Sequence, residues 1–242
     1  MQKVLSTMRK AIEKYHLIEN HDKIAVGVSG GKDSLCLLKA LSDFKKFNLY
    51  DYEIVAVTID IYNGKEDYSK LKKFCDDLNI ELYIEKTDIK NIVFDIRHES
   101  NPCSLCAKMR RGALNSVCNK LGCNKLALAH HLQDVVTTFF MSLFYEGRLS
   151  TMLPISYMSN SKITLIRPLY LTEESKIINA TKNFPILKSK CPANDDSKRK
   201  EIKELIIQLE KQMPGLRKRV EHAILVDESY NLLDKVKNFK TE

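Results

Sequence analysis

Apolar and polar positions along the chain form blocks that predict strands and helices in regular succession. Short apolar runs predict buried strands at residues 23–28, 53–59, 81–84, 125–129 and 163–168. Apolar positions at helical spacing predict helices at residues 2–20, 34–47, 66–79, 104–120, 132–145 and 173–183. Alternating strands and helices are typical of parallel sheets, because a crossover helix returns the chain to the starting edge. We therefore expect an α/β fold with a parallel five-stranded sheet and helices on both faces.

The same pattern predicts three consecutive parts. We expect an N-terminal helix in residues 1–22, an α/β domain that carries the chemistry in residues 23–195, and a charged helical extension in residues 196–242. No internal repeat, low-complexity tract or linker rich in Pro, Gly or Ser interrupts this plan. The 242 residues suffice for one substantial domain with a small appendage.

The composition indicates a globular protein, since 44% of the residues are hydrophobic and 29% are charged. No apolar run approaches the roughly 18–20 residues that a membrane span needs. The first residues lack the apolar core of a signal peptide, so we expect a cytoplasmic protein with no membrane partner. The formal net charge of +8 suits a polyanionic partner such as nucleic acid.

A glycine turn between the first predicted strand and the next helix carries the most specific signal. Residues 29–34 read Ser-Gly-Gly-Lys-Asp-Ser. Backbone N–H groups at a helix start have no partner within the helix and favour an anion, most often a phosphate. The two glycines permit close approach of a ligand, and Lys32 adds a mobile positive charge. The loop is not a Walker A loop, which has four residues between its first glycine and its Gly-Lys pair.

Further polar residues end two other predicted strands. Asp60 ends the second strand, and His130 and His131 follow the fourth. Open α/β sheets bind ligands at the carboxyl ends of their strands. We therefore expect these side chains to lie at the same edge as the glycine turn.

Seven cysteines in a chain without a secretion signal favour metal or redox chemistry over a disulfide framework. Cys103 and Cys106 form a C-x-x-C pair, and Cys191 lies in a predicted loop beside a proline. Three thiolates can hold a [4Fe–4S] cluster with one iron left unligated by protein. A redox pair and a turn cysteine without a ligand role are the alternatives. We expect the remaining four to be buried structural residues: Cys36, Cys75, Cys118 and Cys123.

The glycine turn, the C-x-x-C pair, His-His-Leu-Gln-Asp at 130–134, Arg-Pro-Leu at 167–169 and Cys191 follow one another in this order. Together they resemble the tRNA 2-thiocytidine synthetase family, the TtcA-type tRNA sulfurtransferases among the PP-loop, N-type ATP pyrophosphatases. The resemblance spans roughly residues 20–195. It implies that ATP adenylates the 2-carbonyl oxygen of a pyrimidine, a cytidine in the anticodon loop of tRNA. It further implies that sulfur carried on a [4Fe–4S] cluster then replaces that oxygen.

The resemblance also implies roles for individual residues. Lys32, Asp33 and Asp134 would be catalytic: Lys32 and Mg²⁺ would neutralise charge on the phosphates, and the two carboxylates would organise the metal. Gln133 stands where the family often has an acidic residue. The residues that would contact the nucleotide are Val28, Ser29, Gly30, Gly31, Lys32, Asp33, Ser34, Ile59, Asp60 and His130.

Cluster and tRNA contacts follow from the same resemblance. Cys103, Cys106 and Cys191 match the three iron ligands, although a persulfide on Cys103 or Cys191 is an open alternative. The residues that would bind tRNA are Lys108, Arg110, Arg111 and Arg148. The sulfur donor would be free sulfide or a cysteine desulfurase relay. The terminal helices could also pair two copies of the chain as a homodimer.

Three other functions remain open at this point. A 2-thiouridine-forming sister enzyme would have similar motifs, although it often carries additional zinc-binding cysteine pairs that this chain lacks. A PP-loop ligase for ammonia or lysine would need no thiolates, which the C-x-x-C pair and Cys191 argue against. A nucleotide-binding module without catalysis is disfavoured by the intact Lys32-Asp33 pair.

Overall fold

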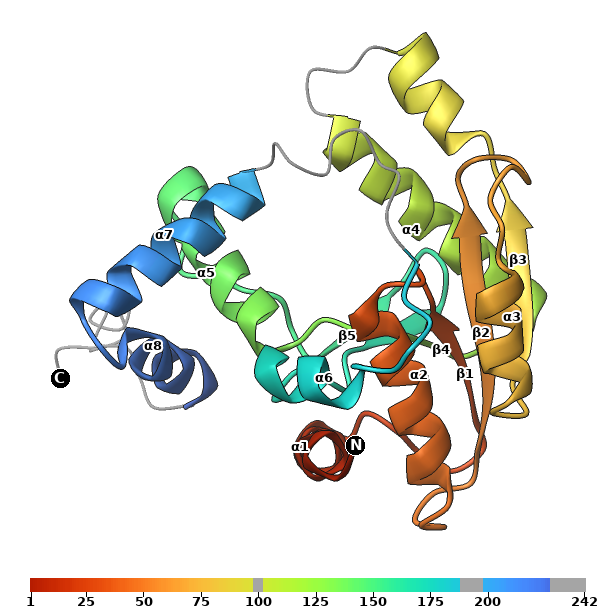
Figure 1. The fold of residues 1–242 in the computed structure, drawn as a ribbon, viewed down its shortest axis with the longest axis horizontal. Coiled ribbons are helices and arrows are strands. Elements are labelled where there is room, and N and C mark those ends of the chain that lie inside the picture. The colour runs from red at the N-terminus through yellow and green to blue at the C-terminus, as the bar shows by residue number, and fades with distance from the viewer. Residues whose placement is uncertain (98–101, 188–197, 227–242) are drawn as a thin grey trace, which may run out of the picture.

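The computed structural model describes residues 1–97, 102–187 and 198–226 of the chain. Within these residues the strands form one sheet of six, in the order β3-β2-β1-β4-β6-β5 (Figure 1). The bounds of the strands are β1 Asp22–Gly27, β2 Tyr52–Asp60, β3 Glu81–Lys86, β4 Lys125–Ala127, β5 Ile155–Met158 and β6 Ile163–Ile166. The chain is therefore an α/β protein, as the hydrophobic pattern predicts.

The five strands expected from the sequence are present, and they pair in parallel. The sixth, β5, was not predicted and pairs antiparallel with β6 at the edge of the sheet. Its signal is weak because it has four residues and one face in solvent, with Tyr157 66% exposed. The sheet is thus mostly parallel with one antiparallel edge hairpin.

The helices lie close to their predicted positions (Figure 1). Their bounds are α1 Gln2–Tyr15, α2 Lys32–Lys45, α3 Ser69–Asp76, α4 Pro102–Lys120, α5 Leu132–Glu146, α6 Glu174–Ala180, α7 Lys198–Gln212 and α8 Leu216–Leu225. A short π-helical segment, Asn91–Ile96, precedes α4 where the sequence shows no regular pattern. None of the helices in the described parts of the chain has the length and apolar character needed to cross a membrane.

Helices cover both faces of the sheet because successive strand residues point to opposite sides. In β1, Ile24 and Val26 face a core shared with α1, α2 and α6, whereas Ala25 faces a second core. Val117 and Cys118 of α4 lie in that second core. A strand buried on both sides needs apolar residues at every position, which explains the uninterrupted runs in the sequence.

The N-terminal helix is part of the main core rather than an attachment to it. Val4, Met8, Ala11 and Ile12 of α1 are at most 1% exposed and belong to the same cluster as the buried leucines of α2. These four positions recur at helical spacing, so one stripe of α1 is fully covered.

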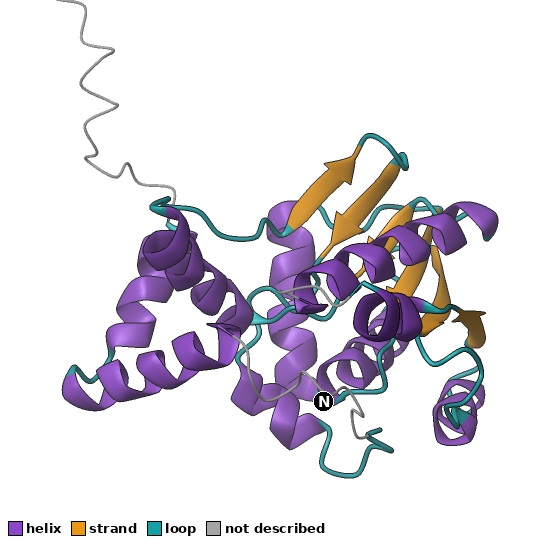
Figure 2. Ribbon diagram, turned by 90° about the horizontal axis from the view of Figure 1, so that it is seen from above, coloured by secondary structure: helices purple, strands orange, loops and turns teal. Residues whose placement is uncertain are grey.

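The C-terminal helices α7 and α8 lie to one side of the sheet and pack on α5 (Figure 2). Val136 and Phe140 of α5 form a small separate core with Ile202 and Ile206 of α7. The predicted boundary between residues 195 and 196 lies outside the described residues and stays a prediction.

If α1 belongs to the core, replacing its buried methionine should be costly. Met8→Ala should lower the free energy of unfolding by about 3 kcal/mol, the usual cost of emptying a buried methionine site. Met213→Ala is the matched control, since Met213 is 45% exposed, and it should cost less than about 0.5 kcal/mol. Urea denaturation measures both, and equal values for the two variants would show that α1 packs only loosely.

Candidate active site

The predicted phosphate-binding loop lies at the carboxyl edge of the sheet, between β1 and α2. Gly30 has the left-handed φ of +80°, and Gly31 caps α2 with an extended backbone. The Ser34 hydroxyl donates to the Gly31 carbonyl at 2.9 Å and accepts from the Ser29 N–H at 3.2 Å. These side-chain bonds fix the loop while the start of α2 presents its positive end.

Gly30 is needed for a second reason besides its backbone angle. Leu187 donates its N–H to the Gly30 carbonyl at 2.9 Å. A Cβ atom at position 30 would lie 2.7 Å from Leu187 Cδ1 and 2.9 Å from its Cβ, closer than real side chains approach. The chain after α6 is therefore in direct contact with the loop.

A cavity of about 370 Å³ opens beside the loop. Its walls come from the loop, the ends of β1, β2 and β4, and one side of α4. Ten residues singled out from the sequence line it: Val28, Ser29, Gly31, Asp33, Ser34, Ile59, Arg110, Arg111, His130 and Asp134. The fold thus brings together residues that lie up to about a hundred positions apart in the chain.

Other predicted site residues lie elsewhere. Asp60 is 1% exposed, and its carboxylate accepts from the N–H groups of Tyr62 and Gly64, so it shapes the turn after β2 instead of lining the cavity. Lys108 is exposed on α4 outside the cavity lining. Arg148 lies just after the far end of α5, where it pairs with Glu146 at 2.6 Å.

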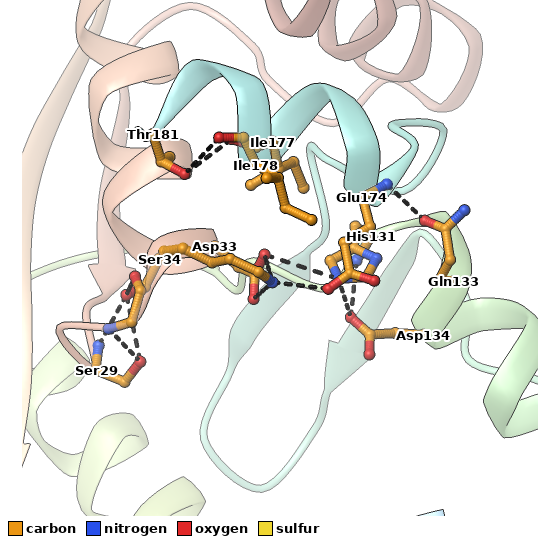
Figure 3. Close-up of polar contacts among 12 residues, drawn as sticks. Ser29, Asp33, Ser34, His131, Gln133, Asp134, Glu174, Ile177, Ile178 and Thr181 are labelled. Carbon is orange, nitrogen blue, oxygen red and sulfur yellow. Dashed lines mark hydrogen bonds and ion pairs between the residues drawn. The ribbon is translucent and has the colours of Figure 1, made fainter. Parts of the chain in front are cut away.

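A charged cluster forms one side of the site (Figure 3). The Lys32 ammonium lies 2.9 Å from Asp33 Oδ1 and 2.8 Å from Glu174 Oε1, which comes from the start of α6. Burial alone would lower the pKa of Lys32, but the hydrogen bonds to Glu174 and Asp33 outweigh it and raise the pKa. Lys32 is therefore a fully charged cation held between two carboxylates.

His131 lies at the centre of this cluster, and its side chain is 2% exposed. Its Nε2 atom is 3.4 Å from Asp134 Oδ2, 3.7 Å from Asp33 Oδ1 and 4.0 Å from Glu174 Oε1 (Figure 3). The Asp134 carboxylate also accepts the His131 N–H at 3.1 Å and so caps the start of α5.

Asp134 links the cluster to the C-terminal helices. Arg199 of α7 donates to Asp134 Oδ1 at 3.0 Å, and Lys203 lies 3.7 Å from the same oxygen. Burial would raise the pKa of Asp134, but His131 and Arg199 outweigh it and lower the pKa to about 2. Asp134 is therefore ionised throughout the physiological range.

Gln133 occupies the position flagged in the sequence as a departure from the family pattern. Its side-chain oxygen accepts the backbone N–H of Glu174 at 2.6 Å (Figure 3). It therefore fixes the start of α6, the helix that supplies the carboxylate beside Lys32.

His130 has a different environment from its neighbour. Its Nδ1 atom accepts a hydrogen bond from Arg167 Nε at 3.2 Å, and the residue lines the cavity. Burial, with the nearby Arg167 guanidinium, lowers the pKa of His130 to about 4. The ring is therefore neutral at pH 7.

The C-x-x-C pair lies at the start of α4. Cys103 is exposed and Cys106 is 9% exposed, and a spacing of three places them on one helical face. Ala107, the next residue, lines the cavity. Cys191 lies outside the described residues, and within those residues no three His, Cys, Asp or Glu side chains form a group that could hold a metal.

The remaining cysteines are buried, as the sequence predicts: Cys36, Cys75, Cys118 and Cys123. Burial raises the pKa of Cys36 and of Cys118 to about 12. Such thiols stay protonated and unreactive near neutral pH.

Several residues of the site were not predicted. Glu174 and Lys203 come from segments without a recognisable motif, and Arg167 was noted only as part of Arg-Pro-Leu. Arg199 belongs to a basic run at 198–200 that suggests phosphate contacts, but it pairs with Asp134 instead. No spacing rule links them to the loop because tertiary packing alone brings them there. His131 was expected at this edge of the sheet, but its burial among three carboxylates has no signature in one sequence.

Comparison with known proteins gives consistent matches over nearly the whole chain. A family model described as a PP-loop domain matches residues 2–209. The tRNA-cytidine(32) 2-sulfurtransferase of Geobacter sulfurreducens is 37% identical over 229 residues, which cover 92% of this chain and 89% of the relative. The protein of the same name from Syntrophotalea carbinolica is 36% identical and covers 99% of this chain and 95% of its own.

A solved structure also matches. The U34-tRNA thiolase NcsA from Methanococcus maripaludis, determined with its [4Fe–4S] cluster, aligns with a TM-score of 0.72 at 26% identity. The alignment covers 91% of this chain and 77% of that protein.

Two glycines offer a test of the loop geometry. Gly30→Ala should lower the free energy of unfolding by at least about 2 kcal/mol, because the left-handed backbone and the contact with Leu187 both oppose a Cβ. Gly112→Ala is the matched control. Gly112 lies within α4, and a Cβ added there would have nothing within 4 Å, so the free energy of unfolding should rise by up to about 1 kcal/mol. Chemical denaturation decides, and a change of the same sign in both variants would contradict the geometry.

The neutral state of His130 predicts a pH dependence of stability. The folded pKa of about 4 lies below the ordinary value near 6.5, so the unfolded chain binds the proton more readily. The resulting stability is fully present above about pH 6.5 and is lost as the pH falls toward about 4. Between pH 7 and pH 5 this amounts to about 2 kcal/mol, which should be absent in His130→Gln. Urea denaturation at the two pH values measures it, and a variant that keeps the full pH dependence would contradict the burial of a neutral ring.

Proposed function

The chain belongs to the tRNA 2-thiocytidine synthetase family of PP-loop proteins, and on this premise we propose that it is an ATP-dependent tRNA sulfurtransferase that converts cytidine 32 to 2-thiocytidine. One observation carries the proposal beyond family membership. The phosphate-binding loop, the arginines of α4 and the helical turn that holds Cys103 and Cys106 all adjoin one cavity. Nucleotide, RNA and sulfur chemistry could therefore meet there.

ATP activates a carbonyl oxygen that would otherwise be a poor leaving group. In the proposed reaction the 2-carbonyl oxygen of the pyrimidine attacks the α-phosphate, pyrophosphate leaves, and the oxygen becomes part of an AMP leaving group. The residues between Ser29 and Ser34 would hold the phosphates through backbone N–H groups. Lys32 would neutralise charge that develops as pyrophosphate departs.

Mg²⁺ would bind at the carboxylate side of the cavity. Mg²⁺ prefers oxygen ligands, usually one or two carboxylates together with substrate phosphates. Asp33 and Asp134 both line the cavity and offer carboxylate oxygens, the ligand type that this ion prefers. We propose that they orient the metal against the phosphates.

A [4Fe–4S] cluster fits the donors at the start of α4. Cys103 and Cys106 lie on one face of the helix, and thiolates are the usual ligands of iron–sulfur clusters. We propose Cys191 as the third ligand, and the cluster, when bound, would supply sulfur as the nucleophile. Ala107, the residue after Cys106, lines the cavity, so a cluster held by this thiol pair would lie near the nucleotide site.

tRNA would reach the same cavity from its basic side. Arg110 and Arg111 line it, whereas Lys108 and Arg148 lie outside its lining and would contact more distant phosphates of the tRNA. Backbone contacts of this kind give salt-dependent affinity, and selection of the base would depend on an unstacked nucleotide entering the cavity. Free sulfide or a cysteine desulfurase would deliver the sulfur.

The comparisons favour this function over the alternatives from the sequence. The relatives with 36–37% identity carry the name of a cytidine sulfurtransferase, so an enzyme is favoured over a module without catalysis, and sulfur transfer over ligation. The NcsA match keeps the uridine-thiolating branch as the second candidate.

The decisive experiment is nucleoside mass spectrometry of tRNA from a strain that lacks this chain. 2-Thiocytidine should disappear, and a plasmid copy should restore it. Copies with Lys32→Ala or Cys103→Ser should fail, because the first loses the phosphate cation and the second a sulfur-site ligand. Cys118→Ser is the matched control on the same helix; its thiol lies in the second core, away from the cavity lining, and any folded product should still form 2-thiocytidine.

Purification without oxygen separates the parts of the proposal. The protein should be brown, and Cys103→Ser should lose the colour while still binding ATP. Loss of a 2-thiouridine in place of 2-thiocytidine would assign the chain to the sister branch. Unchanged tRNA nucleosides would reject the function.

A further inference from the structure

Arg167 is held rigidly behind the cavity. It follows β6, and only 9% of the residue is exposed. Its Nη1 donates to the Leu153 carbonyl at 2.5 Å, and its Nε donates to His130 Nδ1 at 3.2 Å. A guanidinium is planar and keeps its donors in fixed directions, so the first bond orients the second.

This hydrogen bond determines where His130 carries its proton. A guanidinium can only donate, so Nδ1 of the ring must offer its lone pair. A neutral imidazole has one N–H, and it must therefore lie on Nε2. A protonated ring would point an N–H at the guanidinium, which has no acceptor, and would also place a second positive charge beside it. Both effects disfavour the protonated form of His130.

We infer that Arg167 is a positioning residue that fixes His130 as a neutral donor, with its N–H on Nε2, for an acceptor oxygen of the ligand in the cavity. The identity of that ligand as ATP rests on the proposed function; the protonation state does not. The two residues would then contact the ligand differently. Lys32 is a cation shared with carboxylates, whereas His130 is an uncharged hydrogen-bond donor.

The charged groups around His130 agree with a neutral ring. Asp134 of α5 would favour the charged form, but Arg167, Arg199 of α7 and the neighbouring His131 oppose it, as does burial. Burial and the positive charge of Arg111 of α4 in turn lower the pKa of the Arg167 guanidinium. The low pKa of His130 supports this balance. A neutral donor keeps its function when the pH changes, and it does not compete with Lys32 for the carboxylates.

Nitrogen NMR of the imidazole tests the inference directly. Protein labelled with ¹⁵N-histidine shows which ring nitrogen carries the proton, and His130→Gln identifies the His130 signals. The wild-type ring should be the Nε2–H form at pH 7 and should stay neutral down to about pH 5. In Arg167→Leu the ring should populate both neutral forms and titrate at higher pH.

Two further variants serve as controls. Arg167→Lys should recover the Nε2–H form in part, because an ammonium can donate one hydrogen bond to Nδ1. Arg9→Leu removes an exposed arginine that pairs with Glu13 on α1 and should leave the His130 signals unchanged. If Arg167→Leu does not fold, the wild-type spectrum still decides: an Nδ1–H ring or an imidazolium at pH 7 overturns the inference.

Ligand binding tests the donor itself. The amide nitrogen of glutamine can reach the position of Nε2, whereas that of asparagine reaches only the position of Nδ1. By calorimetry with the non-hydrolysable analogue α,β-methylene ATP, His130→Gln should bind within about threefold of wild type. His130→Asn should bind about tenfold more weakly, the effect of one lost hydrogen bond. Equal affinities would overturn the donor role.

The NMR and calorimetry measurements do not depend on tRNA thiolation. A negative result in the nucleoside experiment would therefore be distinguishable from a negative result here.

Discussion

The carboxylate of Asp134 joins three parts of the molecule: the start of α5, the charged cluster of the cavity and helix α7. It accepts from the His131 N–H and from Arg199, and its side chain is only 14% exposed. A buried charge that loses a partner is strongly destabilising, because no water replaces the lost interaction. Helix α7, which packs on α5 through Ile202 and Ile206, therefore cannot leave without uncovering this carboxylate. The C-terminal helices therefore help to hold the site in place through Asp134. Among the described residues, none from these helices lines the cavity itself.

The pairing of charges in the cavity is uneven, and this favours an anionic ligand. The carboxylates of Asp33, Asp134 and Glu174 already have cationic or histidine neighbours within the protein. Arg110 and Arg111, in contrast, have no ion-pair partner among residues 1–97, 102–187 and 198–226. Unpaired guanidinium groups on a concave wall attract phosphates, which they can bind in a bidentate manner. Among the described residues, these two arginines are therefore left for an anionic substrate, whereas Lys32 is shared with the carboxylates.

Sequence reasoning predicted the parts of the molecule that local rules determine. The five parallel strands follow from apolar runs buried on both faces, and the loop from Gly30 and its neighbours. The edge strand β5 escaped because four half-exposed residues give no periodic signal. Asp60 was expected to contact the ligand. Its carboxylate instead accepts hydrogen bonds from backbone N–H groups of the turn after β2, and the sequence pattern gives no sign of these bonds. The contacts of Glu174 with Lys32 and of Arg199 with Asp134 could not be predicted because tertiary packing alone forms them.

Gln133 illustrates how a local departure can be compatible with an intact site. Its oxygen accepts the Glu174 N–H, a bond that a carboxylate could make equally well. A carboxylate here would, however, add a fourth negative charge near Asp33, Asp134 and Glu174, where Lys32, Arg199 and Lys203 supply the cations. Like charges in a partly buried cluster repel one another, so each added carboxylate makes ionisation of the others less favourable. The amide keeps the hydrogen bond that fixes α6 and adds no charge, so the Glu174 carboxylate remains available to Lys32.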